Sequence, residues 1–131
     1  MHINVVNTPN LTLAYMGDVV YELFIREKLV RSGKAKVNDL HKTAIRYVRA
    51  EAQAEVLRAL ESSFDPDEQA VVRRGRNAKS GRPPKNADLM DYRLATAFEA
   101  LLGYLYLSGR TERLQEVLEM AWANLHQQPT I

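Results

Sequence analysis

The chain has 131 residues, of which 46% are hydrophobic and none is cysteine. This length fits one domain, residues 1–131, with a core of its own, and the lack of cysteine excludes disulfides and thiolate metal sites. The first ten residues lack the basic start of a signal peptide, and the longest apolar run is shorter than the ~20 residues of a membrane span, so we expect a soluble cytoplasmic protein with no membrane partner.

The first predicted helix covers residues 11–31 and is apolar on nearly all sides. Turn-forming residues at 7–10 indicate its start, and Gly33 indicates its end. Two acids interrupt it, Asp18 and Glu22, which are four residues apart and therefore share one face. Because like charges at this spacing repel each other, we expect a basic side chain or a cation beside them.

Capping residues mark the starts of the other predicted helices. These caps are Asn38 or Asp39, Asp65 before Pro66, Asn86 and Thr111. The helices that follow cover residues 39–60, 67–74, 87–107 and 111–125. The first of them bends near 48–50, Gly109 terminates the third, and the tail at 127–131 is expected to be frayed. No alternating β pattern occurs, so the sequence predicts an all-α helical bundle.

One segment carries the positive charge of the chain. Residues 73–85, RRGRNAKSGRPPK, contain six of the 18 basic residues and no acid, so the remaining 12 bases face 16 acids. Two glycines and two prolines predict that the segment, up to Asn86, is a loop. A basic loop suits phosphate backbones, although it is also typical of a solvated linker. The candidate RNA-binding residues are Arg73, Arg74, Arg76, Asn77, Lys79, Arg82 and Lys85.

Residues 94–107, LATAFEALLGYLYL, form the most apolar stretch of the chain, and Glu99 is its only charged residue. A helix this apolar is normally buried in a bundle, where an ionised carboxylate requires a partner. Either Glu99 lies at the edge of the core and pairs with an Arg or Lys, or it meets Asp18 of the first helix. Two carboxylates in a partly dry site need a cation, and hard oxygen ligands suit Mg²⁺ or Mn²⁺.

An acidic metal site beside a basic loop indicates metal-assisted hydrolysis of a nucleic-acid phosphodiester, with Asp18 and Glu99 as catalytic metal ligands. Thr96 shares a face with Glu99 and either orients a water at the metal or bonds the preceding turn of its own helix. Glu22 is a supporting candidate, although a surface or interface role suits it better. Gly17 either belongs to the site or permits close packing of two helices.

Two motifs resemble the signatures of ribonuclease III catalytic domains. LAYMGDVVYEL, residues 13–23, is similar to the first, which places Gly-Asp on a helix, and LATAFEALLGYLYL is similar to the second, which places Asp-x-x-Glu-Ala-Leu-x-Gly on another. Their order, the basic loop between them and the short chain with no double-stranded-RNA-binding domain resemble the Mini-ribonuclease III subfamily. The family's acids fall on Asp18 and Glu99, whereas two further acids are replaced by Ala14 and Thr96.

The resemblance implies a ribonuclease III-type helical domain that cleaves double-stranded RNA with Mg²⁺, or Mn²⁺ in its place, and leaves a 5′-phosphate. It implies a homodimer with two active sites across an RNA groove, and Tyr15, Tyr21 and Phe24 are candidate contacts between the two subunits. It also implies a role in maturation of 23S ribosomal RNA, with a ribosomal protein as a further partner. The missing acids at Ala14 and Thr96 keep a non-catalytic RNA-binding or ribosome-assembly protein open. A helical interaction module without a nucleic-acid role is the third hypothesis.

Overall fold

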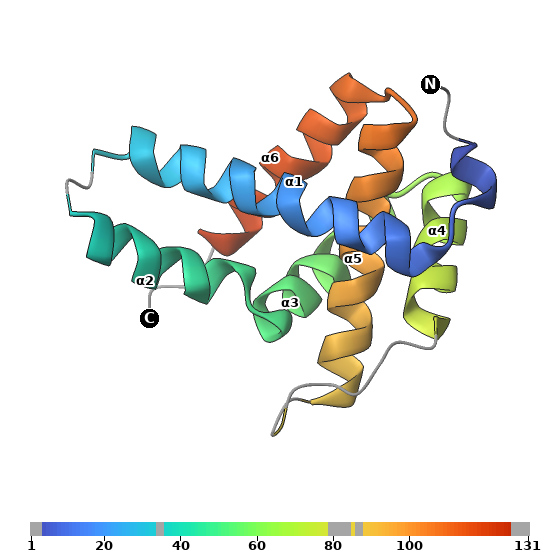
Figure 1. Ribbon diagram of the computed structural model, residues 1–131, viewed down its shortest axis with the longest axis horizontal. Coiled ribbons are helices and arrows are strands. Elements are labelled where there is room, and N and C mark those ends of the chain that lie inside the picture. The colour runs from blue at the N-terminus through green and yellow to red at the C-terminus, as the bar shows by residue number, and fades with distance from the viewer. Residues whose placement is uncertain (1–3, 34–35, 79–84, 86–87, 127–131) are drawn as a thin grey trace.

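The structure, a computed structural model, describes residues 4–33, 36–78, 85 and 88–126, and these form helices without any strand (Figure 1). The all-α prediction is therefore confirmed. The elements are the 3₁₀ turn η1 (Val5–Asn7), α1 (Asn10–Arg31), α2 (Val37–Val48), α3 (Ala50–Leu60), the 3₁₀ turn η2 (Glu61–Ser63), α4 (Pro66–Asn77), α5 (Leu89–Leu107) and α6 (Thr111–Leu125).

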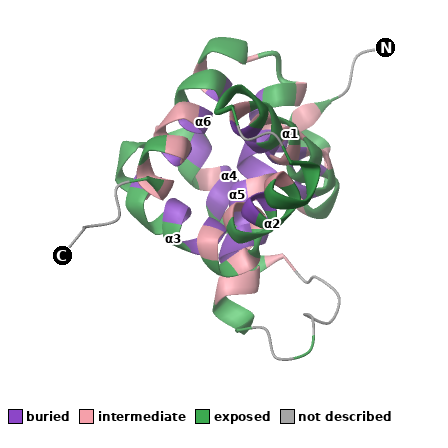
Figure 2. Cartoon of the chain, turned by 90° about the vertical axis from the view of Figure 1, so that its left-hand side faces the viewer, coloured by how far each residue is buried: buried purple, intermediate pink, exposed green. Residues whose placement is uncertain are grey.

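Helix α5 forms the centre of the bundle. Helix α1 crosses it, α2 lies beside α1, and α3, α4 and α6 contact the remaining sides of α5 (Figure 1). Buried residues concentrate on α5 and on the helix faces turned toward it (Figure 2). Phe98, Leu101 and Leu105 are fully buried, and the ring of Tyr21 packs edge-on against Phe98 with centroids 5.2 Å apart. The all-round apolar character of α5 thus reflects neighbours on every side.

The predicted helix ends are partly confirmed. Gly33 and Gly109 follow the ends of α1 and α5 with φ of +87° and +74°, a backbone conformation that favours glycine. The bend in the second predicted helix is a complete break, because Arg49 is extended between α2 and α3. The predicted cap at Asn38 or Asp39 is wrong, since α2 already begins at Val37, and its N-cap, Lys36, makes no side-chain capping bond.

Helix α4 is longer than the sequence predicts. Asp65 caps it as expected and forms a capping box with Glu68. The helix then continues through Gly75 to Asn77, so the first five residues of the predicted basic loop are helical. Gly75 does not break the helix because it serves a contact: a Cβ there would lie 2.8 Å from the Cα of Ala97 on α5. Gly75 therefore allows α4 to pack closely against α5.

The start of α5 also differs from the prediction. The helix begins at Leu89, and the side chain of Asp88 accepts a hydrogen bond from the backbone nitrogen of Asp91. The predicted cap, Asn86, lies outside the described residues. At the next helix, Thr111 is the first helical residue and Arg110 is the N-cap, without a side-chain capping bond. No helix in the described parts of the chain is long and apolar enough to cross a membrane.

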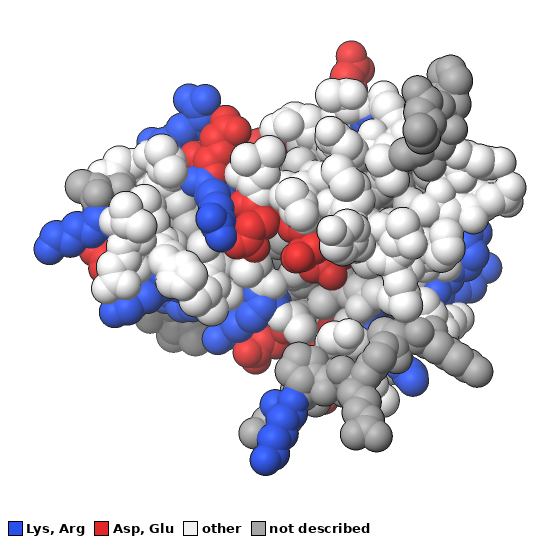
Figure 3. Space-filling model, in the orientation of Figure 1, with Lys and Arg blue, Asp and Glu red and all other residues white. Residues whose placement is uncertain are grey.

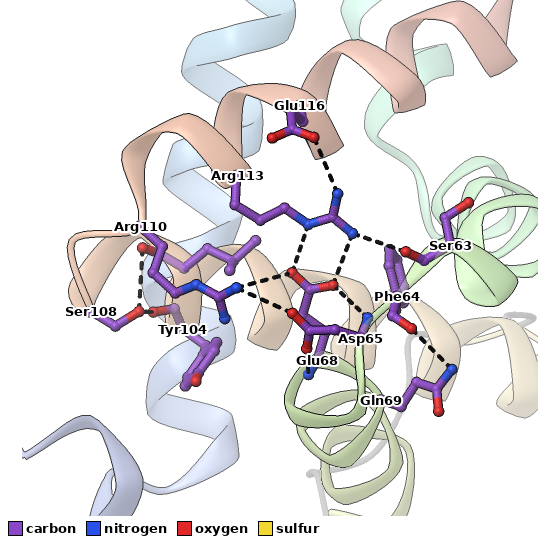
Figure 4. A network of polar contacts seen from close by, with 11 residues as sticks. Ser63, Phe64, Asp65, Glu68, Gln69, Tyr104, Ser108, Arg110, Arg113 and Glu116 are labelled. Atoms are coloured by element: carbon purple, nitrogen blue, oxygen red, sulfur yellow. Dashed lines mark hydrogen bonds and ion pairs between the residues drawn. The ribbon is translucent and has the colours of Figure 1, made fainter.

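A buried acid ties the last helix to the bundle (Figure 4). Glu68 is fully buried, and its carboxylate receives two hydrogen bonds from the Arg113 guanidinium at 2.8 and 2.9 Å. It also accepts a bond from the backbone nitrogen of Asp65, whose side chain pairs with Arg110. The two arginines thus connect α6 and the turn before it to the N-terminus of α4.

Replacing Arg113 with Met is expected to lower the free energy of unfolding by about 3–5 kcal/mol, because the Glu68 carboxylate would remain buried without its main partner. Urea unfolding measures the loss. Arg31→Met is the matched control, since Arg31 pairs with Glu27 on the surface and such pairs contribute about 1 kcal/mol or less. Equal losses in the two variants would contradict the assigned role of Glu68.

Candidate metal and active site

Two glycines bring α1 and α5 into backbone contact. A Cβ built at Gly17 would overlap the carbonyl group of Glu99, with its carbon 2.6 Å away, and would lie 2.9 Å from the Gly103 nitrogen. A Cβ built at Gly103 would overlap the carbonyl group of Leu13 in the same way. Gly17 therefore permits close helix packing, and it contacts the backbone of Glu99, whose carboxylate is mostly buried. The next residue along α1 is Asp18.

Glu99 is mostly buried at this crossing, and its carboxylate Oε2 accepts a hydrogen bond of 3.2 Å from Gln53 on α3. The pKa of Glu99 is raised from 4.5 to about 8, mainly by burial and in part by the charge of the neighbouring Asp18 and a side-chain hydrogen bond with it. The Gln53 bond acts in the opposite direction, because it favours the ionised form. The sequence allowed an Arg or Lys partner, but none of the described ones forms an ion pair with Glu99.

The other two acids lie on the exposed side of the crossing. Asp18 is exposed, and Glu22 contributes a weaker charge effect to the pKa of Glu99. Glu22 pairs with Arg26 one turn later at 3.0 Å, so the expected basic partner exists for this acid. Figure 3 shows acidic side chains on the face formed by α1, beside an uncharged area toward the start of that helix. The structure thus brings Asp18, Glu22 and Glu99 near one another.

Thr96 points back into its own helix. It is buried, and its hydroxyl donates a 3.0 Å hydrogen bond to the carbonyl oxygen of Tyr92. Of the two interpretations left open by the sequence, the bond to the preceding turn is the one that the structure shows. Ala14, at the position of the other missing acid, is also buried.

The carboxylates fit a hard divalent cation with few protein ligands. In the described parts of the chain, no three His, Asp or Glu side chains are grouped closely enough to hold an ion together. Mg²⁺ commonly takes one or two carboxylates and keeps several waters, so the pair formed by Asp18 and Glu99 is a sufficient donor set. The raised pKa of Glu99 agrees with this fit, because a cation would favour the ionised form that burial disfavours.

Four of the candidate RNA-binding residues lie on α4, and the others follow it in the chain. Arg73, Arg74 and Asn77 are exposed in the last turns of α4, whereas Arg76 is half-buried and pairs with Glu61 at 2.8 Å. The prediction that these four residues lie in a loop is wrong, because packing at Gly75 keeps the helix intact. Lys85 is exposed, and Lys79 and Arg82 lie outside the described residues.

Sequence reasoning missed Gln53, although the sequence contains a signal for it. Gln53, Val56, Leu57 and Leu60 share the buried face of α3 at spacings of three, four and seven. A polar residue at an apolar core position needs a hydrogen-bond partner, as Glu99 does on α5. The position of Gln53 among the apolar residues of α3 therefore indicates a second buried polar side chain with a partner.

The titration of Glu99 predicts how the stability of the metal-free protein depends on pH. Between pH 4.5 and about 8 the folded protein retains a proton that the unfolded chain has lost. The free energy of unfolding should therefore fall as pH rises through this window, by up to about 1.4 kcal/mol per pH unit from this group. Urea unfolding in EDTA should show a steeper fall in the wild type than in Glu99→Gln. Parallel curves would contradict the assigned pKa.

Comparisons with known proteins identify the family of the chain. A family model described as the Ribonuclease III domain matches residues 11–110. A Mini-ribonuclease 3 from Symbiobacterium thermophilum is 55% identical and spans 90% of this chain and 91% of its own, and one from Brevibacillus brevis is also 55% identical, over 88% and 89%. A crystal structure of a protein from Fusobacterium nucleatum superposes with a TM-score of 0.80 at 26% identity, over 89% and 93%. The chain therefore belongs to the ribonuclease III family, within its Mini-ribonuclease 3 group.

Proposed function

We propose that the protein is a Mg²⁺-dependent endoribonuclease that hydrolyses phosphodiester bonds of double-stranded RNA and leaves 5′-phosphates. The observation that carries the proposal is the exposed Asp18 beside the mostly buried Glu99, at a helix crossing closed by Gly17 and Gly103. The relatives named Mini-ribonuclease 3 support the reaction class.

Asp18 and Glu99 would hold the cation, and Mn²⁺ could replace Mg²⁺ because both accept hard oxygen ligands. When bound, the cation supplies Lewis-acid activation of a phosphoryl oxygen and of the attacking water. Asp18 offers its carboxylate from the exposed face of α1, where an RNA backbone can approach. Glu99 offers a carboxylate fixed by burial and by Gln53. Ala14 and Thr96 contribute no carboxylate, and Glu22 stays a supporting candidate beside them.

The basic residues would bind the RNA backbone. A-form RNA is recognised mainly through its shape and through contacts to phosphates and 2′-hydroxyls. Arg73 and Arg74 are exposed near the C-terminal end of α4, and the chain beyond it adds further bases. The proposed contacts are Arg73, Arg74, Arg76, Asn77, Lys79, Arg82 and Lys85.

A second copy of the chain would complete the RNA groove. Tyr15, Val19 and Leu23 on α1 are 79%, 57% and 66% exposed, an apolar row next to Asp18 that suits a dimer contact. The prediction of Tyr21 for this role is wrong, because Tyr21 is buried against Phe98. Phe24 is half-buried and packs against Trp122, so it offers less free surface than Tyr15.

The cellular substrate we propose is a stem of the 23S ribosomal RNA precursor in the cytoplasm, with a ribosomal protein as an additional partner. Resemblance to the Mini-ribonuclease III subfamily supports this part of the proposal. It is tested separately from the reaction class, by comparing cleavage of a precursor stem with cleavage of an unrelated duplex of the same length.

A cleavage assay tests the reaction class. A long double-stranded RNA should be cut with Mg²⁺ or Mn²⁺ and left intact with EDTA, while a single-stranded control of the same sequence should survive. The absence of acids at Ala14 and Thr96 favours the second candidate, a non-catalytic RNA-binding or ribosome-assembly protein. Salt-sensitive binding to the duplex without cleavage at any metal concentration, also of a precursor stem bound to its ribosomal protein, would establish that alternative and refute the nuclease.

Neutralising two exposed arginines should weaken RNA binding and its salt dependence together. For Arg73→Gln/Arg74→Gln, the slope of log K against log salt should become shallower by about 0.7–0.9 for each phosphate group that the protein no longer neutralises. Filter binding in EDTA measures the slope without cleavage. Arg31→Gln is the control, because Arg31 pairs with Glu27 at the far end of α1. An unchanged slope in the double variant would remove these residues from the interface.

A further inference from the structure

Gln53 is a buried amide fixed between the backbone and the candidate site. It is 2% exposed, and its Nε2 donates to the carbonyl oxygen of Val48 at 2.7 Å and to Oε2 of Glu99 at 3.2 Å. The Val48 carbonyl can only accept a hydrogen bond, which determines that the amide nitrogen faces it and the amide oxygen faces away from it. The extended backbone at Arg49 places the Val48 carbonyl at the break between α2 and α3. The break thus supplies the backbone acceptor that holds the Gln53 amide.

The second polar atom of this amide is unpaired. Gln53 Oε1 is buried and has no hydrogen-bond partner among the described residues. An unsatisfied buried carbonyl costs stability, and such atoms in native proteins are rare enough that each calls for an explanation, such as a catalytic role or a bound water or ion. A hydrated Mg²⁺ beside Glu99 would bring water donors into this region, because Mg²⁺ keeps most of its hydration shell.

We infer that Gln53 is a positioning residue of the metal site: it orients the Glu99 carboxylate toward the cation, and its free Oε1 accepts a hydrogen bond from the cation's hydration shell. This inference rests on the proposed function. Residues that hold metal ligands in place typically change metal affinity or activity by about 10–100-fold when they are replaced. A single amide therefore links the α2–α3 break to the chemistry on α5.

A second glutamine provides a matched control. Gln69 on α4 donates through Nε2 to the carbonyl oxygen of Phe64, five residues earlier, as Gln53 does to Val48. It contacts no carboxylate of the site and lies on the surface. Replacing each glutamine with Met removes the same kind of backbone bond and keeps the side-chain length, but only the change at Gln53 reaches Glu99.

The experiment measures Mn²⁺ binding to the full chain by electron paramagnetic resonance, with thermal unfolding as a check on folding. We expect Gln53→Met to bind Mn²⁺ about 10–100-fold more weakly, and to lose kcat more than it raises KM for RNA. Gln69→Met should bind Mn²⁺ like the wild type. Equal affinities in Gln53→Met and the wild type would overturn the inference, whereas a wild type that binds no Mn²⁺ would overturn the metal site of the proposed function.

A measurement on the wild type covers the case in which Gln53→Met does not fold. The side-chain amide signals of Gln53 and Gln69 can be followed by NMR as Mg²⁺ is added. We expect the Gln53 signals to shift with the same midpoint as metal binding, because its partner Glu99 changes state, and the Gln69 signals to stay in place. Gln53 signals that do not move at saturating Mg²⁺ would refute the inference.

Discussion

Replacing Glu99 with Gln is expected to abolish RNA cleavage and, at the same time, to stabilise the metal-free protein. Activity should fall by about 10³-fold or more, because a neutral amide is a poor ligand for a hard cation. Stability at neutral pH should rise by about 2 kcal/mol, because burial and the nearby Asp18 disfavour the carboxylate. Opposite effects on activity and stability are typical of a functional site formed at a cost to the fold.

Asp18→Asn separates the two effects. Asp18 is exposed, so this variant should lose cleavage to a similar extent with little change in stability. Duplex cleavage under single-turnover conditions and urea unfolding in EDTA measure both quantities for each variant. Full cleavage by either variant would remove that residue from the site. Loss of cleavage with loss of folding would assign it a structural role instead.

The approach of Asp18 to Glu99 could be predicted because each acid contradicts the pattern of its own helix. An acid in a nearly all-apolar helix needs a partner, and only a few such acids occur in the chain. Gln53 is equally anomalous, but it carries no charge, and an uncharged side chain in an Ala-rich helix gives a weaker signal. The direction of its amide also depends on the break at Arg49, whose position the sequence indicates only approximately.

The basic segment illustrates a different limit. Glycine between arginines is typical of a loop, yet Gly75 is helical because α4 and Ala97 of α5 touch at that residue. A glycine inside a helix lowers the stability of that helix by about 1 kcal/mol relative to alanine, and the close packing of α4 against α5 compensates for this loss. Tyr21 shows the same dependence on packing, because nothing in its local sequence distinguishes it from the exposed Tyr15. Tertiary contacts decided both cases.

Replacing Gly17 with Ala is expected to destabilise the protein strongly, although the change adds only one methyl group. The new methyl group would overlap the Glu99 carbonyl, and backbone atoms cannot rotate away as a side chain can. Helices α1 and α5 must separate, which should lower the free energy of unfolding by about 3 kcal/mol or more. Gly103→Ala should behave similarly, because its methyl group would overlap the Leu13 carbonyl.

Gly33→Ala is the control for this prediction, since a Cβ at Gly33 has no atom within 4 Å and its positive φ should cost only about 1–2 kcal/mol. Urea unfolding compares the three variants. The crossing also sets the distance from Asp18 to Glu99, so folded Gly17→Ala should bind Mn²⁺ more weakly, whereas Gly33→Ala should bind it normally. A Gly17→Ala protein as stable as Gly33→Ala, with wild-type Mn²⁺ affinity, would show that the helices tolerate separation and that this contact does not position the site.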